Sequence, residues 1–130
     1  MINHYLFTYG LLRKNAGHKM SKFLSDNAMF FAEGTYQGKL FLIEYYPGVL
    51  PSDDPQDQVV GDIFKLHHPR LLTELDSFEG IGKEHAIPHE YQRMIQPVNC
   101  LGKVIEAWVY VYNWKIRPER RILSGDFLKN

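Results

Sequence analysis

Hydrophobic and polar residues alternate along most of this chain in the way that β-strands require. Segments rich in aromatic and β-branched residues span 4–9, 59–66, 91–98 and 103–114, and their pattern predicts four strands. Residues 28–46 have the same character but contain Gly34 and Gly38, which predicts two strands joined by a turn or a bulge.

Only two segments follow a helical period. Residues 17–26 place Met20, Phe23 and Leu24 on one side, and residues 67–78 do the same with a row of leucines. Residues 47–58 and 83–90 are rich in polar residues and prolines, which predicts loops. Because strands dominate and one helix lies between them, the pattern predicts an α+β fold. We expect a strongly curved or closed mixed sheet with helices outside it or at one end.

The stretch LTELDSFEGIG, residues 72–82, places a carboxylate where the helical pattern calls for an apolar residue. Glu79 follows Leu75 by four residues and Leu72 by seven, so it falls on their side of the helix. Gly80 predicts a left-handed C-cap. The helix dipole and burial would both disfavour a charged carboxylate there and raise its pKa. Glu79 is therefore a candidate general acid or base; the alternative is a helix-end glutamate that turns to solvent or pairs with a basic residue.

The first predicted strand runs into the stretch TYGLLR, residues 8–13. Gly10 permits a turn with positive φ and a close approach of a ligand to the backbone. The N–H groups that follow can form an anion-binding nest. The stretch lacks the GK[ST] element of a phosphate-binding loop, and a purely structural turn is the alternative.

Strict alternation divides the strand at 103–114 into two faces. One face carries small and β-branched residues that suit a core, whereas the other carries Glu106, Trp108, Tyr110 and Tyr112. The second face suits a pocket wall whose hydroxyls orient a ligand. Tyrosines that pack over the sheet with their hydroxyls in water are the alternative.

Composition narrows the function classes. The length of 130 residues suits one domain, residues 1–130. Fifteen basic and fifteen acidic residues cancel, which leaves no excess of positive charge to bind nucleic acid. We see no signal-peptide pattern and no apolar run as long as a membrane span, and the single cysteine, Cys100, excludes an internal disulfide. These features favour a cytoplasmic protein that binds neither nucleic acid nor membrane.

No metal or cofactor motif stands out. The six histidines form no HExxH or other recognised ligand pair, and Cys100 has no identifiable base partner. The chain also lacks the GxSxG element of serine hydrolases. We therefore expect neither a metal nor a cofactor.

Several short motifs occur in a fixed order along the chain. They are YGxLR at residues 9–13, GDIF at 61–64, LxxLDxFEG at 72–80, YxR at 91–93, AWVYVY at 107–112 and SGDF at 124–127. In this order and at these distances they resemble the gamma-glutamylcyclotransferase-like family, which includes gamma-glutamylamine cyclotransferase and AIG2-like proteins. The resemblance spans nearly the whole chain.

The resemblance implies a small mixed β-barrel with flanking helices and a cavity at one end. It implies an enzyme that cyclises the gamma-glutamyl group of a small amine or amino acid to 5-oxoproline and releases the free amine without a cofactor. The enzyme would be a monomer or a weak homodimer. Glu79 would be the catalytic acid/base. The implied substrate-binding residues are Tyr9, Gly10, Leu11, Leu12, Arg13, Tyr110 and Tyr112.

One position departs from the family pattern. The turn usually carries Ser or Thr where this chain has Leu11, so a hydroxyl donor is lost. This substitution keeps open the alternative of a non-catalytic module that binds a small molecule in the same cavity. Another alternative is action on a gamma-glutamyl-protected intermediate of a biosynthetic pathway.

Overall fold

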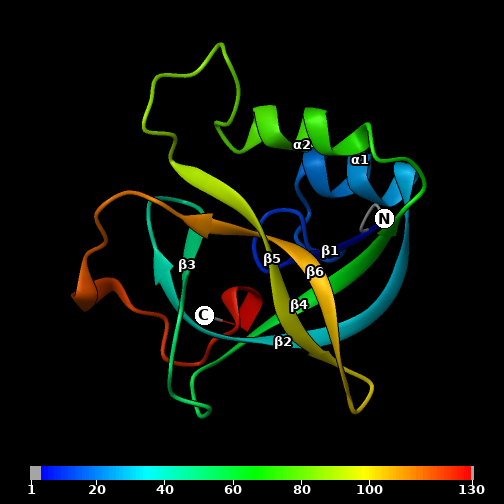
Figure 1. Cartoon of the computed structure of the whole chain (residues 1–130). Helices are drawn as coiled ribbons and strands as arrows, with labels where there is room; N and C mark the ends of the chain where they lie inside the picture. The colour runs from blue at the N-terminus through cyan, green and yellow to red at the C-terminus, as the bar shows by residue number, and fades with distance from the viewer. Residues whose placement is uncertain (1–3, 130) are drawn as a thin grey trace.

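A closed β-barrel forms the centre of the computed structural model, which describes residues 4–129 (Figure 1). Its strands are β1 Tyr5–Thr8, β2 Ala28–Leu42, β3 Pro47–Pro51, β4 Gln58–Leu66, β5 Tyr91–Cys100 and β6 Lys103–Tyr112. The helices are α1 Lys19–Asn27 and α2 Leu71–Phe78, and two short 3₁₀ helices, η1 Pro118–Arg120 and η2 Phe127–Lys129, follow β6.

The strands are hydrogen-bonded in the order β3-β2-β4-β1-β6-β5, and a pairing between β2 and β5 closes the barrel. At the closure, Thr35 of β2 lies opposite Asn99 of β5. Five strands thus form the barrel, and β3 adds to the other part of the long strand β2. Because β1 runs parallel to β6 and the other pairs are antiparallel, the sheet is mixed. The predicted α+β barrel with flanking helices is confirmed.

Side-chain alternation divides the core into two hydrophobic clusters. Along β6, Ala107, Val109 and Val111 belong to one cluster, which also contains inward-facing residues of the other barrel strands. Tyr110 and Tyr112 belong to the second cluster, together with the buried leucines of the two helices. Both predicted faces are therefore buried at residues 109–112, each in a different cluster, whereas Glu106 is exposed and Trp108 is half-buried.

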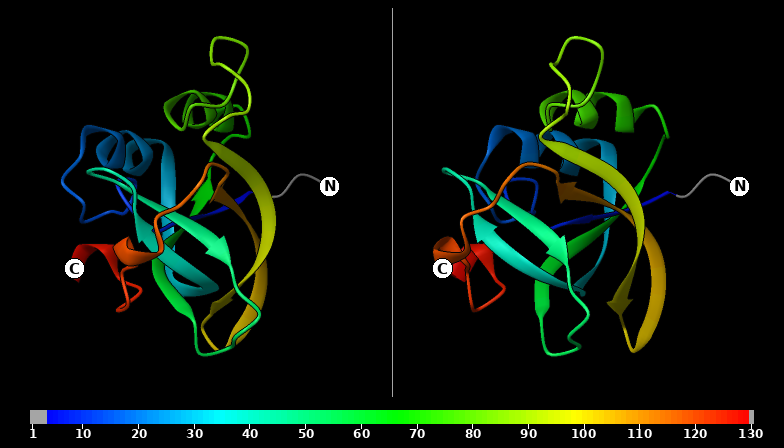
Figure 2. Two further views of the ribbon diagram at one scale, coloured as in Figure 1. Left: turned by 90° about the vertical axis from the view of Figure 1, so that its left-hand side faces the viewer. Right: turned by 60° about the vertical axis from the view of Figure 1, so that its left-hand side comes forward.

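The two helices lie together over one end of the barrel (Figures 1 and 2). Leu24 of α1 and Leu75 of α2 are fully buried in the second cluster. The N–H of Gly80 donates to the Ser77 carbonyl, and that of Ile81 to the Asp76 carbonyl. Gly80 has a φ of 78°, so α2 ends in a Schellman motif and the predicted glycine C-cap is confirmed. Neither helix in the described part of the chain has the length and apolar character needed to cross a membrane.

Two local predictions were wrong. Residues 28–42 form one strand with an irregularity between Phe30 and Ala32, because a bulge bends a strand without ending it. The segment 47–58, expected to be a loop throughout, contains β3. This strand pairs only with β2, and an edge strand tolerates the missing N–H groups of Pro47 and Pro51.

Candidate active site

A pocket of about 220 Å³ opens beside the loop that follows β1. Residues 9–12 of this loop, called here the YGLL loop, all contribute to the pocket wall. The remaining wall comes from the end of β1, the segment from the β2–β3 turn to the start of β3, the C-terminal end of α2, the start of β5 and Tyr110 of β6. The pocket therefore collects segments that are far apart in the sequence.

The YGLL loop turns through a hydrogen bond of 3.0 Å from the Arg13 N–H to the Gly10 carbonyl. Gly10 does not have the positive φ expected from the sequence. A side chain there would instead meet the Pro47 ring, whose Cγ lies 2.6 Å from the position of an added Cβ. The glycine is needed for space. Within residues 4–129, nothing accepts a hydrogen bond from the N–H of Leu11 or Leu12, so both donors remain for a ligand.

Three tyrosines on the pocket wall are buried, and each donates a hydrogen bond. The Tyr9 hydroxyl donates to the Tyr110 carbonyl at 2.5 Å, and the Tyr91 hydroxyl donates to the Pro47 carbonyl at 2.6 Å. Burial raises the pKa of Tyr9, Tyr91 and Tyr110 well above the ordinary value. All three are neutral at physiological pH, and they give the pocket a rigid polar wall.

Glu79 is the C-cap residue that directly follows α2, and it lines the pocket. Some of its surface stays accessible because it faces the pocket, but protein atoms crowd the carboxyl group. Desolvation, with smaller contributions from Glu90 and Asp76, raises the pKa of Glu79 to about 8. In the described structure Glu79 forms no ion pair, so both protonation states are accessible near neutral pH.

Arg93, a basic residue that could have neutralised Glu79, is committed to Asp76. Its Nε and Nη2 donate to the two carboxylate oxygens of Asp76 at 2.7 and 3.0 Å. The Tyr110 hydroxyl donates to the same carboxylate at 2.8 Å, and the guanidinium lies over the Trp108 ring. This pairing neutralises Asp76, the first carboxylate of the LDxFEG motif, and leaves Arg93 unavailable to Glu79, the second.

Glu90 is a second pocket carboxylate, which the sequence did not indicate. Its Oε2 accepts a hydrogen bond of 2.6 Å from the Tyr46 hydroxyl, and its carbonyl accepts one from the Asn113 N–H. No lysine, arginine or histidine lies among the described residues of the pocket wall. Glu90 was missed because it lies in the segment 83–90, which was expected to be a polar loop. Tyr46 was missed because it was placed in the strand segment 28–46, whereas it lies in the turn between β2 and β3.

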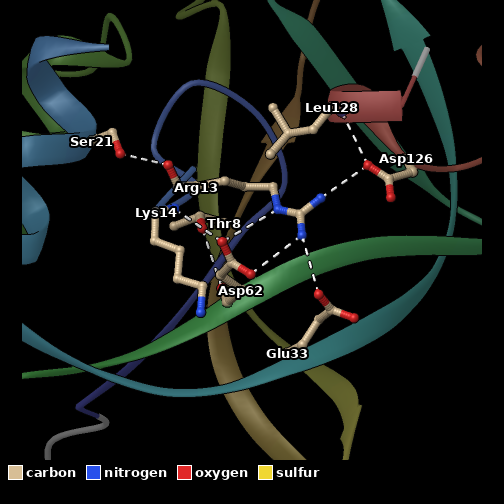
Figure 3. Close-up of polar contacts among 8 residues, drawn as sticks. All are labelled: Thr8, Arg13, Lys14, Ser21, Glu33, Asp62, Asp126 and Leu128. Atoms are coloured by element: carbon tan, nitrogen blue, oxygen red, sulfur yellow. Dashed lines mark hydrogen bonds and ion pairs between the residues drawn. The ribbon is translucent and has the colours of Figure 1, made fainter. Parts of the chain in front are cut away.

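Two residues of the expected substrate-binding set lie outside the pocket wall. Arg13 directs its side chain into a buried group of carboxylates instead (Figure 3). Tyr112 packs edge-on against the Tyr91 ring, with ring centroids 5.2 Å apart. The other expected residues, Tyr9, Gly10, Leu11, Leu12 and Tyr110, line the pocket together with Glu79.

Residues 4–129 contain no group of three or more His, Cys, Asp or Glu side chains placed to hold a metal ion. The reacting groups that this site itself supplies are therefore a carboxyl of raised pKa, neutral hydroxyls and free backbone N–H groups.

Residues 6–129 match the sequence profile of a family described as Gamma-glutamyl cyclotransferase, AIG2-like. The chain belongs to this family. A relative, the Gamma-glutamylcyclotransferase family protein YtfP of Escherichia coli strain K12, is 30% identical over 125 residues, which cover 95% of each chain.

Solved structures show the same fold at lower sequence identity. YkqA from Bacillus subtilis superposes with a TM-score of 0.74 at 22% identity over 98% of this chain, which spans only 40% of YkqA. An AIG2-like protein from Mus musculus gives a TM-score of 0.69 at 24% identity, covering 92% of this chain and 83% of the mouse protein. The barrel and its helices are thus shared by this group of proteins.

Proposed function

We propose that this protein is a gamma-glutamylcyclotransferase that acts on a small gamma-glutamyl amine or amino acid. The observation that carries the proposal is Glu79, an unpaired carboxyl of raised pKa that faces a pocket beside the free N–H groups of the YGLL loop. Membership of the cyclotransferase family supports the same reaction.

The reaction is an internal acyl transfer. The α-amine of the glutamyl group attacks its own γ-carbonyl carbon, a new C–N bond closes the five-membered ring, and the bond to the leaving amine breaks. Holding the substrate folded in the pocket brings the two groups into attack geometry, which removes much of the entropic barrier. The products are 5-oxoproline and a free amine.

Glu79 would move the single proton that the reaction requires. Its carboxylate accepts a proton from the attacking amine, and the resulting acid delivers a proton to the departing nitrogen. A pKa near 8 suits both steps, because neither protonation state is far from working pH. The N–H groups of Leu11 and Leu12 would bind a substrate carboxylate or the negative oxygen that develops on the carbonyl.

The test is release of 5-oxoproline from a panel of gamma-glutamyl compounds that spans amino acids, ε-lysine, simple amines and glutathione. Glu79→Gln keeps the shape of the side chain but cannot carry a proton, so turnover should fall by about 10²–10⁴-fold. Glu74→Gln is the matched control, because Glu74 is an exposed residue of the same helix. Undiminished turnover by folded Glu79→Gln protein would refute the role.

Leu11 favours a second candidate function. Its side chain, which has no hydroxyl, forms part of the pocket wall, so the pocket has one polar contact fewer than the family pattern. A binding module that retains the pocket without turnover would bind panel compounds in a calorimeter and release no 5-oxoproline.

A further inference from the structure

Arg13 directly follows the YGLL loop, is 5% exposed and lies outside the pocket wall. Its Nε and Nη2 donate to the two carboxylate oxygens of Asp62, each at 3.3 Å, and its Nη1 donates to Asp126 at 3.0 Å. Figure 3 shows the guanidinium between these carboxylates. Glu33 lies farther away, at 3.6 Å, and its side chain is exposed.

Asp62 contacts the chain on both sides of the YGLL loop. Before the loop, the Thr8 hydroxyl donates to the Asp62 carbonyl at 3.2 Å. After the loop, the Lys14 N–H donates to the Asp62 carboxylate at 3.0 Å. The Arg13 carbonyl also accepts a hydrogen bond from the Ser21 hydroxyl of α1. One residue of β4 thus fixes the two ends of the loop relative to each other.

Asp126 contacts Arg13 from the opposite end of the sequence, within the SGDF motif. Its Oδ1 also accepts a hydrogen bond from the Leu128 N–H, and its own N–H donates to the Ser124 hydroxyl. The Gly125 carbonyl accepts a hydrogen bond of 2.7 Å from the Val60 N–H of β4. The segment 124–128 is therefore fixed to the barrel, and its carboxylate has a defined position against the guanidinium.

We propose that Arg13, Asp62 and Asp126 are positioning residues, through which the C-terminal SGDF segment holds the YGLL loop in the geometry that binds the glutamyl group. The inference rests on the proposed function, because it concerns how that substrate is held. Arg13 connects the loop to these carboxylates, because its backbone N–H donates to the Gly10 carbonyl and its side chain donates to Asp62 and Asp126.

The physical reason is that a short loop with free N–H groups has little to keep it in place. The N–H groups of Leu11 and Leu12 stabilise negative charge only if their direction is fixed before the substrate arrives. A displacement of about 1 Å can reduce the rate by about 10²-fold. A planar guanidinium between fixed carboxylates restricts such a displacement, since its donors have defined directions.

The experiment compares Asp126→Ala, Asp126→Asn and a control, Arg121→Met, in the full-length protein. Arg121 lies just before the SGDF segment and forms an ion pair of 2.8 Å with Asp57, and neither residue lines the pocket. The readouts are KM and kcat for 5-oxoproline release, the pH dependence of kcat, and the melting temperature. Amide hydrogen exchange at Arg13, whose N–H donates to the Gly10 carbonyl, reports on the loop directly.

We expect Asp126→Ala to raise KM by about tenfold or more, while the pH dependence of kcat, which reports Glu79, stays unchanged. Asp126→Asn keeps an acceptor oxygen toward Arg13 and should recover most of the binding. Arg121→Met should lower the melting temperature without changing KM. Wild-type KM and exchange in Asp126→Ala, together with a melting temperature lowered as in the control, would overturn the inference.

Failure of the proposed function has a separate signature. If wild-type protein releases no 5-oxoproline from any compound in the panel, the cyclotransferase proposal fails. In that case, amide hydrogen exchange still tests whether Arg13, Asp62 and Asp126 position the loop. Faster exchange of the Arg13 amide in Asp126→Ala than in Arg121→Met supports it, and equal exchange in the two variants overturns it.

Discussion

Two groups of carboxylates lie near the YGLL loop, and they differ in what surrounds them. Asp62 and Asp126 are buried against the guanidinium of Arg13, outside the pocket wall. Glu79 and Glu90 face a pocket whose described wall contains no basic side chain. The same chemical group therefore occurs in a neutralised and in an unneutralised setting within one small protein.

The comparison shows how context decides what a buried carboxylate does. A buried charge is tolerated when an opposite charge and hydrogen bonds replace its water. Glu79 lacks such a partner, so burial and the neighbouring acids raise its pKa to about 8. The first arrangement favours a fixed structure, whereas the second favours a group that exchanges a proton.

Removing the Arg13 guanidinium, which neutralises the first group of carboxylates, should have the largest effect. Arg13→Met leaves Asp62 and Asp126 buried without a counter-charge, so the free energy of unfolding should fall by about 3–5 kcal/mol. Equilibrium unfolding in urea measures it. Glu33→Gln is the control, because its exposed contact with Arg13 should contribute only about 0–1 kcal/mol. Equal stability of the two variants would show that the buried cluster does not stabilise the fold.

The unneutralised carboxylate predicts a stability that depends on pH. The pKa of Glu79 is about 8 in the folded protein against an ordinary 4.5, so between these values the native state binds more protons than the unfolded state. Stability contributed by this proton is present below about pH 4.5 and is lost as pH rises toward 8. Glu79→Gln cannot ionise and should escape this loss.

Unfolding of wild type and Glu79→Gln in urea at pH 5 and pH 9 measures the difference. From pH 5 to pH 9, the free energy of unfolding of Glu79→Gln should rise relative to that of wild type by about 1 kcal/mol or more. Each unit of pKa shift corresponds to about 1.4 kcal/mol, and water in the pocket screens part of it. A constant difference across this range would show that the native state does not raise the pKa of Glu79.

Replacing Glu90, the acidic neighbour of Glu79, should have the smallest effect of these changes. Glu90→Gln removes the second-largest cause of the raised pKa of Glu79, after burial, so that pKa should move down toward its ordinary value. The acidic limb of the pH profile of kcat/KM should shift to lower pH. Glu84→Gln is the control, because its exposed carboxylate accepts a hydrogen bond from Ser77 outside the pocket. An unchanged profile in Glu90→Gln would contradict the coupling.

Local patterns were sufficient for much of the fold. Alternation predicted the strand at 103–114 and its two faces, and the helical period with Gly80 predicted where α2 ends. The strand at 28–42 was divided wrongly, because a glycine within a long strand gives the same local signal as a turn. β3 was missed because its prolines resemble those of a loop, although an edge strand accommodates them.

The candidate site was only partly predictable. Glu79 stood out because a carboxylate broke an apolar period, and the YGLL loop because a glycine followed a strand. Glu90 gave no such signal, since loop residues have no period to break, and Tyr46 was one of many aromatic residues in the strand segment predicted at 28–46. Arg13 was expected at the substrate because it belongs to the same motif as Tyr9, but its side chain points away from the pocket wall.

The sequence by itself thus determined the strands and helices that have a clear period, the end of α2 and the unusual position of Glu79, because these depend on neighbours along the chain. The tertiary structure alone decided which charges pair. It placed Asp126 against Arg13, 113 residues away in the sequence, and committed Arg93 to Asp76. Closure of the barrel brings these segments together, and that closure leaves Glu79 without a cation while Arg13 gains two carboxylates.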